Sequence, residues 1–213
     1  MLRMLKQALR RTVSGFMAGI LISIGGCVFL SCREIQGIGY VAGAVLFSVA
    51  LLCICIKGYA LFTGKVGFLP EKHDRDAVAE LLLALLGNTL AVFLFGLCLR
   101  YAIPAIGAGA EAVCTAKLTQ TLPGTLVRAV MCGILMYLAV SIYRDRKQLV
   151  GILFCIPVFI LAGFEHSIAD MFYFAAAGNL TGRSLLYLAL VVVGNGVGGV
   201  LLPLLSMLGR ERT

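Results

Sequence analysis

The chain has 213 residues, of which 61% are hydrophobic and only 13% are charged, whereas about 25% of the residues of a typical soluble domain are charged. This composition, a mean hydropathy of +1.01 and repeated apolar runs exclude an ordinary soluble domain and predict an integral membrane protein. The net charge of +8 does not indicate a nucleic-acid partner, because the basic residues lie in short loops and tails, where they orient a membrane protein.

The first residues, MLRMLKQALRR, are basic and precede a long apolar run without an A-x-A-type cleavage site. We interpret them as an amphipathic cytoplasmic helix rather than a cleaved signal. Six spans follow, each near the roughly 20 residues that a bilayer requires: 13–31, 38–62, 77–99, 125–143, 149–174 and 184–208. The predicted organisation is a cytoplasmic segment over 1–12, one transmembrane domain over 13–208 with its repeats over about 13–99 and 125–208, and a cytoplasmic tail over 209–213.

Lys and Arg are most numerous in the N-terminal segment, in the loops after the second and fourth spans, and at the C-terminus. The positive-inside rule assigns such segments to the cytoplasmic face. We therefore expect both termini to be cytoplasmic, in a bacterial-type cytoplasmic (inner) membrane. The eight Cys lie mostly in spans and form no CxxC pair, so we interpret them as small packing residues and expect neither a metal nor a cofactor.

The two halves of the chain resemble each other. LLGNTLAVFLFG (85–96) and VVGNGVGGVLLP (192–203) both place Gly-Asn inside an apolar helix, and GYALFTGK (58–65) matches GFEHSIAD (163–170) in its Gly-aromatic start and final charge. Each half contains three spans, an odd number, so the second half has the opposite topology. The prediction is an all-α membrane protein of two inverted three-helix repeats with broken helices 2 and 5, a pattern found in transporters and channels.

The candidate functional residues lie at the two predicted breaks. His166 is the one histidine within a predicted span, where an ionisable group indicates function by default. Its neighbour Glu165 is expected to fix the interrupted backbone or an interhelical contact. Thr63, at the matching break, either hydrogen-bonds His166 and sets its tautomer or caps its own helix. Because Glu165, His166 and Ser167 are adjacent and point in different directions, they do not predict a catalytic triad, and we expect no enzyme.

The sequence GFEHSIADMF (163–172) closely resembles the GFEHSIANM signature of the formate/nitrite transporter family. LFTG (61–64) resembles the family's loop motif in the second span, and GNGVGG (194–199) its motif in the sixth. The resemblance implies an aquaporin-like protomer with its own pore, assembled as a homopentamer in the lipid bilayer. It also implies passage of small monovalent anions of weak acids, such as formate, nitrite or hydrosulfide.

The resemblance also implies roles for particular residues. The family's central histidine corresponds to His166, its loop threonine to Thr63, and its basic vestibule residue to Lys117. Its two apolar constrictions correspond to Leu51, Phe47 and Phe159, and to Leu61 and Phe62.

Four positions depart from the family pattern. Ala60 stands where an acid is usual, Tyr137 and Asp170 where Asn is expected, and Lys57 where the residue is usually apolar. All four surround the expected pore, so the choice of substrate does not follow from the resemblance.

Two departures suggest an ion pair. Lys65 and Asp170 occupy matching places in the two repeats. A lone charge at membrane depth is costly and a paired charge is less so. We therefore expect Lys65 or Lys57 to pair with Asp170 or Glu165.

Two transport mechanisms remain open at this point. In the first, an anion takes up a proton near His166, or meets a protonated imidazole there, and crosses the constrictions as the neutral acid. In the second, the chain is a neutral small-solute channel for water, ammonia or hydrogen sulfide, which the inverted-repeat architecture alone would allow. Flux without pH dependence or charge movement would favour the second.

Overall fold

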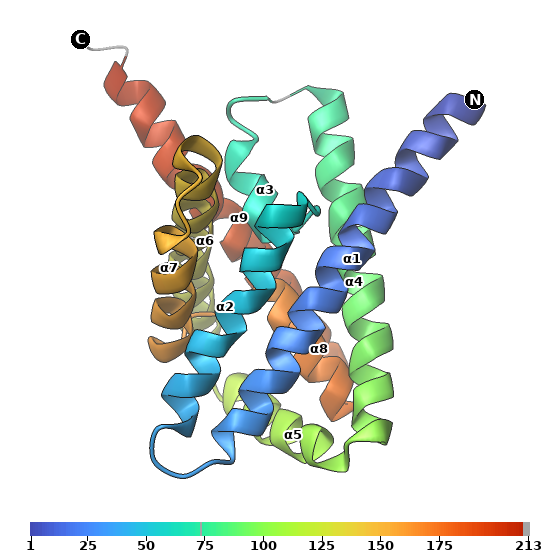
Figure 1. Ribbon diagram of the computed structural model, residues 1–213, viewed down its shortest axis with the longest axis vertical. Helices are drawn as coiled ribbons and strands as arrows, with labels where there is room; N and C mark the ends of the chain where they lie inside the picture. The colour runs from blue at the N-terminus through green and yellow to red at the C-terminus, as the bar shows by residue number, and fades with distance from the viewer. Residues whose placement is uncertain (73, 211–213) are drawn as a thin grey trace.

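The computed structural model describes residues 1–72 and 74–210 (Figure 1). Every regular element in this part of the chain is helical. The elements are α1 (Leu2–Arg33), α2 (Gly39–Lys57), α3 (Phe62–Lys65), the 3-10 helix η1 (Val66–Phe68), α4 (Arg75–Ala102), α5 (Pro104–Leu118), α6 (Leu122–Arg146), α7 (Val150–Leu161), α8 (Ser167–Ala177) and α9 (Gly182–Arg210). His73 and residues 211–213, which include most of the predicted cytoplasmic tail, lie outside the described residues.

Five helices are long and apolar enough to cross a membrane, namely α1, α2, α4, α6 and α9, and α7 and α8 are shorter apolar helices. The molecular surface agrees with a lipid environment. On α4, Leu82, Leu86, Leu90 and Leu94 recur every four residues, and each is about half exposed, so one face of the helix presents a continuous apolar stripe. The chain is therefore an integral membrane protein.

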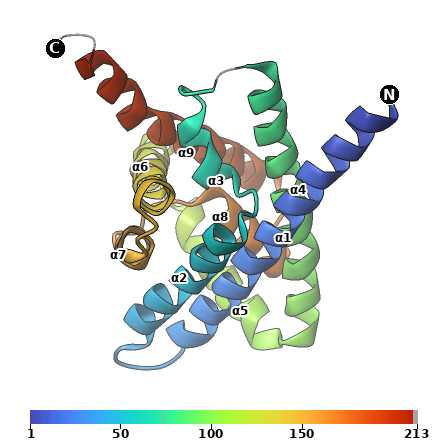
Figure 2. The ribbon, with the colours of Figure 1, turned by 45° about the horizontal axis from the view of Figure 1, so that its top comes forward.

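The first helix extends beyond the bundle. Its 32 residues at 1.5 Å each exceed the roughly 30 Å hydrocarbon core of a bilayer. From Leu2 onward, the predicted segment 1–12 is part of this helix without interruption. The free ends of α1 and α9 project from the body on the same side, and α5 lies at the opposite end (Figures 1 and 2). Arg11 ties the base of the projecting part to α4 by donating to both carboxylate oxygens of Asp76, at 2.9 and 2.5 Å.

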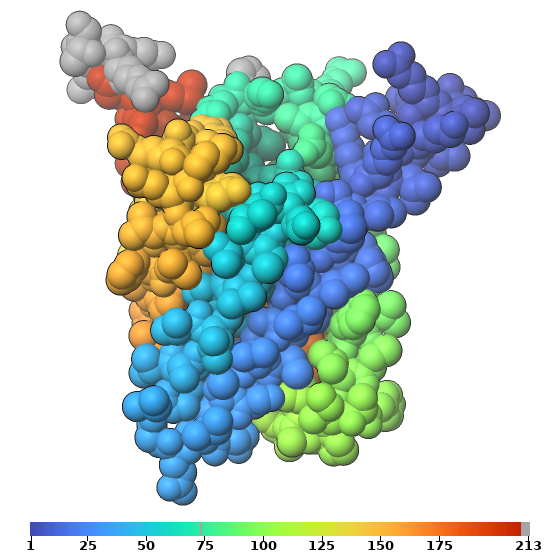
Figure 3. All heavy atoms as spheres, viewed as in Figure 1, coloured from blue at the N-terminus to red at the C-terminus, as the bar shows by residue number. Residues whose placement is uncertain are grey.

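Two helix pairs form the frame of the bundle: α1 packs along α4, and α6 packs along α9. Glycines allow the close approach in both pairs. A Cβ atom on Gly87 would lie 2.2 Å from the carbonyl oxygen of Thr12, and one on Gly198 would lie 2.0 Å from that of Val130. The helix α2 lies beside α1 and α7, and these three helices make up much of the face shown in Figure 3, with the green α4 and α5 at its lower right.

The helix α5 occupies part of the stretch 102–124, for which the sequence predicts no span. Pro104 begins this helix, a position where its missing N–H costs nothing. Gly107 faces Arg100 of α4 and Ala176 of α8, whereas Gly109 faces Leu30 of α1, so these small residues let α5 pack against its neighbours. This packing brings Lys117, near the end of α5, into the interior of the protein.

The glycine contacts predict a large effect of one methyl group. Gly198→Ala should lower the melting temperature of the purified protein, because overpacking of a close backbone contact costs about 1–3 kcal/mol. Gly182→Ala is the matched control on the same helix, since a Cβ atom there meets nothing within 4 Å. Equal melting temperatures for the two variants would contradict the role assigned to Gly198.

Candidate functional site

Two non-helical segments face each other inside the bundle. The Gly58 segment (residues 58–61) joins α2 to α3, and the Gly163 segment (residues 162–166) joins α7 to α8. Gly58 and Gly163 adopt φ values of 70° and 67°, in the left-handed region that glycine enters at least cost. Leu61 and His166 then hold extended conformations at the N-caps of α3 and α8.

Asn88 of α4 holds the Gly58 segment. Its Oδ1 accepts the backbone N–H of Phe62 at 2.9 Å, and its Nδ2 donates to the carbonyl oxygens of Gly15 and Ala60 at 2.8 and 2.9 Å. The side chain is completely buried. One amide thus satisfies three backbone groups that no water reaches at this depth.

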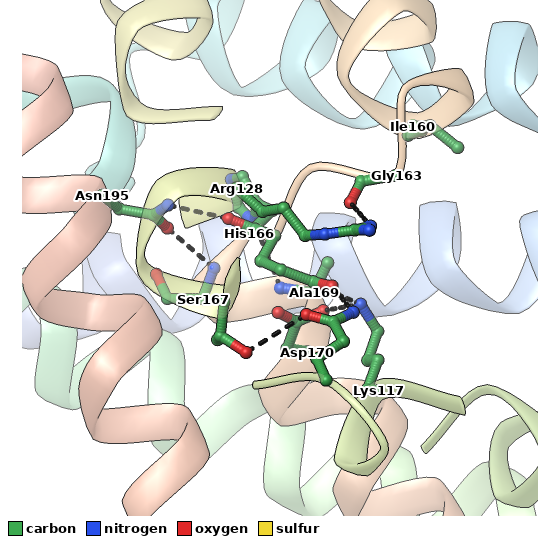
Figure 4. Close-up of polar contacts among 12 residues, drawn as sticks. Lys117, Arg128, Ile160, Gly163, His166, Ser167, Ala169, Asp170 and Asn195 are labelled. Atoms are coloured by element: carbon green, nitrogen blue, oxygen red, sulfur yellow. Dashed lines mark hydrogen bonds and ion pairs between the residues drawn. The ribbon is translucent and has the colours of Figure 1, made fainter. Parts of the chain in front are cut away.

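Asn195 of α9 does the same for the Gly163 segment. Its Oδ1 accepts the N–H of Ser167, and its Nδ2 donates to the carbonyl oxygens of Ala129 and Glu165, each at 2.8 Å (Figure 4). The paired Gly-Asn motifs are visible in the sequence, but this function of the two asparagines was not predicted from them. The signal was present, because an amide within an apolar helix needs buried partners.

Both ring nitrogens of His166 are engaged. Nδ1 accepts the backbone N–H of Ala169 at 3.2 Å, and Nε2 lies 2.9 Å from Oγ1 of Thr63. Because Nδ1 is an acceptor, the neutral ring carries its hydrogen on Nε2 and donates it to Thr63. Two roles were left open for Thr63, and the one observed is the hydrogen bond to His166. The imidazole also stacks on Phe159, with ring centroids 5.6 Å apart.

Lys117 lies between two buried carboxylates. Its Nζ donates to Oε2 of Glu165 and lies 2.9 Å from Oδ1 of Asp170. The second oxygen of Glu165 accepts Nε2 of Gln120 at 2.6 Å. Figure 4 shows Lys117 reaching Asp170 from the ribbon below. Glu165 therefore fixes Lys117 through its side chain, and its carbonyl fixes the backbone through Asn195.

The predicted ion pair named the wrong lysine. Lys65 donates to Glu80 of α4 at 2.5 Å, and Lys57 is exposed at the end of α2. Lys65 and Asp170 do not come into contact, because α4 supplies the acidic partner of Lys65. The carboxylates of Glu165 and Asp170 instead meet Lys117, which α5 carries to them.

Two cavities lie on either side of the two segments. The α5 cavity, of about 390 Å³, is lined by His166, Lys117, Asp170, Phe47 and Phe159 among others. The termini-side cavity, of about 260 Å³, is lined by residues that include Leu51, Leu61, Lys65, Tyr143 and Arg144.

The residues that the resemblance implies as constrictions are all buried between or beside these cavities. Phe47 and Phe159 meet edge to face, with centroids 6.5 Å apart, in the wall of the α5 cavity. Leu51 lines the termini-side cavity with Leu61, rather than the α5 cavity with the two phenylalanines. Phe62 is 5% exposed and follows Leu61 at the start of α3.

The other departures from the family pattern have structural roles. Ala60 is buried and carries only a methyl group. Its backbone N–H donates to Oγ of Ser14 at 3.0 Å. Tyr137 of α6 packs on Phe68, with ring centroids 5.5 Å apart, and would be 2.5 Å from a Cβ atom on Gly67. No group of three or more His, Cys, Asp or Glu in the described part of the chain is arranged to hold a metal ion.

The comparisons with known proteins agree with this geometry. The model of the formate/nitrite transporter family matches residues 2–208. The chain belongs to the formate/nitrite transporter family. This confirms the resemblance drawn from the motifs, and membership of a family of transporters means that the chain is a transport protein and not an enzyme.

Individual relatives are distant but nearly full-length. A probable formate transporter of Methanothermobacter thermautotrophicus is 28% identical, over 89% of this chain and 84% of its own. The formate channel BtFdhC of Bacillus thuringiensis is 26% identical, over 88% and 81%. Among solved structures, a pentameric formate channel with formate bound has a TM-score of 0.83 at 21% identity, covering 98% of this chain and 99% of its own. At that identity the likeness shows the fold.

The asparagine contacts generate a stability prediction. Asn195→Leu should lower the melting temperature by several degrees or prevent folding, because it leaves three buried backbone groups unpaired at roughly 1–3 kcal/mol each. The control is Gln7→Leu, which makes a comparable amide-to-leucine change at an exposed position of α1. Similar melting temperatures for the two variants would show that the Gly163 segment does not depend on Asn195.

Proposed function

We propose that the chain is a channel for small monovalent anions of weak acids, such as formate, nitrite or hydrosulfide, and that passage is proton-linked at His166. The observation that carries this proposal is the position of the His166–Thr63 bond. His166 lines the α5 cavity, and Thr63 lies between Leu61 and Gly64, which line the termini-side cavity. The bonded pair thus spans the interval between the two cavities.

Charge around both cavities supports an anionic solute. The α5 cavity includes Arg33 and Arg128 with Lys117 in its wall. The termini-side cavity includes Lys147 and two further basic residues, Lys65 and Arg144, that are paired with acidic side chains. Basic clefts raise the local concentration of anions. His166 also caps the N-terminus of α8, where the helix dipole contributes partial positive charge.

The apolar side chains between the cavities support a proton-linked crossing. A bare anion loses its hydration at Phe47, Phe159, Leu51 and Leu61, whereas a neutral acid passes the same barrier at much lower cost. In the resting geometry the Nε2–H of His166 is donated to Thr63, so a solute receives this hydrogen bond only by replacing Thr63 as the acceptor. Proton uptake at Nδ1 requires the bond from the Ala169 N–H to open, because both groups would otherwise be donors.

The proposed architecture is six spans in two inverted three-helix repeats, with the second and fifth helices broken at the Gly58 and Gly163 segments. The equivalent bonding of Asn88 and Asn195 supports this assignment. The proposed domain ranges are a cytoplasmic segment over 1–12, one transmembrane domain over 13–208 and a cytoplasmic tail over 209–213.

We further propose that the chain assembles as a homopentamer in the lipid bilayer of the cytoplasmic (inner) membrane, with both termini in the cytoplasm. The likeness to a pentameric channel over 98% of the chain supports the assembly. The excess of Lys and Arg on the side of the termini supports the orientation.

A neutral small-solute channel, for water, ammonia or hydrogen sulfide, is the second candidate. One observation favours it: Lys117 is bound by two buried carboxyl groups, those of Glu165 and Asp170, so its positive charge is not free to attract an anion. A neutral solute would cross without moving charge, and its flux would not depend on the protonation of His166.

The test is flux through purified protein in liposomes, with formate, nitrite and hydrosulfide supplied in turn at pH 5.5 and 7.5. Flux of at least one anion should rise at low pH, and His166→Phe should reduce it at least about tenfold while the protein still assembles, because the variant lacks the polar ring at the barrier. Tyr101→Phe, at a residue 81% exposed, and protein-free liposomes are the controls. Full proton-coupled flux in His166→Phe would count against the mechanism, and pH-independent flux without charge movement would favour the neutral solute.

A further inference from the structure

The part of α1 that precedes Arg11 carries exposed leucines. This projecting segment (residues 2–10) extends beyond the bundle and leans away from it (Figures 1 and 2). Leu2, Leu5 and Leu9 are 66%, 67% and 62% exposed there. Three leucines in contact with water on one short helical segment are unfavourable, because apolar surface gains free energy when it leaves water. The segment therefore calls for an apolar partner.

The sequence LRMLKQALR (2–10) places a basic residue directly after each leucine. Two stripes result along the helix: the leucine stripe consists of Leu2, Leu5 and Leu9, and the basic stripe consists of Arg3, Lys6 and Arg10. Members of each stripe are three or four residues apart, so they lie on one face of the helix. The basic stripe runs beside the leucine stripe, about 100° further around the helix axis.

The leucine stripe points away from the bundle. Arg11 binds Asp76 of α4 and thus marks the side of α1 that faces the bundle, and Leu2 lies about 180° around the helix from Arg11. Further along α1, Val13 and Ile24 continue the leucine stripe and are 46% and 53% exposed. The leucine stripe is therefore an extension of the outward-facing apolar surface of the span.

The length of α1 places the projecting segment at the membrane surface. The 32 residues of the helix make it about 48 Å long. A bilayer is roughly 30 Å thick across its hydrocarbon core and roughly 40–45 Å thick with its headgroups. A tilted helix of this length stays within the bilayer, and the part that exceeds the core lies in a headgroup layer.

The charge of the segment fits an anionic surface. The first acidic residue of the chain is Glu34, and no acidic side chain of the described residues forms an ion pair with the basic stripe. A second copy of the chain fits less well, because Lys and Arg are most numerous on the side of the termini and would repel the basic stripe. Lipid phosphates attract Lys and Arg, and the positive end of the helix dipole adds to this attraction.

We propose that the projecting segment binds the surface of an anionic lipid bilayer. The leucine stripe inserts among the outer parts of the acyl chains, and the basic stripe extends to the lipid phosphates. Apolar burial and electrostatic attraction act together on such a helix, so its binding depends on anionic lipid. The inference rests on the chain being a membrane protein and is independent of the solute that the chain passes.

The experiment uses tryptophan fluorescence of the full-length protein, because the chain contains no Trp. Leu5→Trp places one indole on the leucine stripe, and Gln7→Trp, at an exposed residue on the opposite face, is the matched control. Each protein is reconstituted in liposomes of phosphatidylcholine, alone or mixed with phosphatidylglycerol, with and without brominated acyl chains that quench nearby indoles. With phosphatidylglycerol, Leu5→Trp should emit at shorter wavelength than Gln7→Trp and be quenched at least about threefold more strongly by brominated lipid.

A second comparison isolates the basic stripe. Changing its three residues to Gln in the Leu5→Trp protein should remove at least about half of the lipid quenching, as should about 1 M salt, which shortens the Debye length to about 3 Å. The matched control removes the same number of exposed positive charges elsewhere on the side of the termini and should keep the quenching. Its changes are Lys72→Gln, Arg75→Gln and Arg146→Gln.

Three results would overturn the inference. Equal emission and equal quenching of Leu5→Trp and Gln7→Trp would show that the leucine stripe does not face lipid. Short-wavelength emission of Leu5→Trp without lipid quenching would show that a second copy or another protein covers the leucine stripe. Strong quenching that persists in phosphatidylcholine alone and without the basic stripe would show that apolar contact holds the segment and that anionic lipid is not its partner.

Discussion

The structure depends on satisfying the backbone groups that two helix interruptions expose inside a membrane protein. No water is available in the bilayer core, so each free N–H or C=O group needs a partner within the protein. Asn88 and Asn195 provide these partners, each with three hydrogen bonds to backbone groups. Because the Gly58 and Gly163 segments are held in this way, Thr63 and His166 come within 2.9 Å of each other.

The chemistry of the site follows from that fixed backbone. The N-terminus of α8 presents the N–H of Ala169 to Nδ1 of His166, and this contact determines which nitrogen carries the hydrogen. The same helix turn places Asp170 beside Lys117. The two carboxyl groups differ in their contacts: both oxygens of Glu165 accept hydrogen bonds, whereas Oδ2 of Asp170 has no hydrogen-bond partner.

Much of this site was predicted from sequence patterns, and the predictions that were wrong or incomplete have a common cause. The matched stretches 58–65 and 163–170 located both interruptions, and the motifs placed Thr63 opposite His166. The expected partner of Asp170 was wrong because Lys65 was chosen by its place in the repeat, whereas Glu80 of α4 lies within reach and binds it. Lys117 was predicted only as a vestibule residue, since the stretch 102–124 shows no pattern that reveals how α5 packs.

The sequence by itself determined that this is a helical membrane protein, because hydropathy, glycine positions and motif spacing act locally along the chain. It also determined the family, through motifs that the match over residues 2–208 confirms. Only the tertiary structure decided which lysine meets Asp170, which cavity each apolar residue lines, and which tautomer His166 holds. Those features join residues far apart in the chain, as in the contact between Lys117 and Asp170. Such contacts depend on how helices pack, which no local pattern specifies.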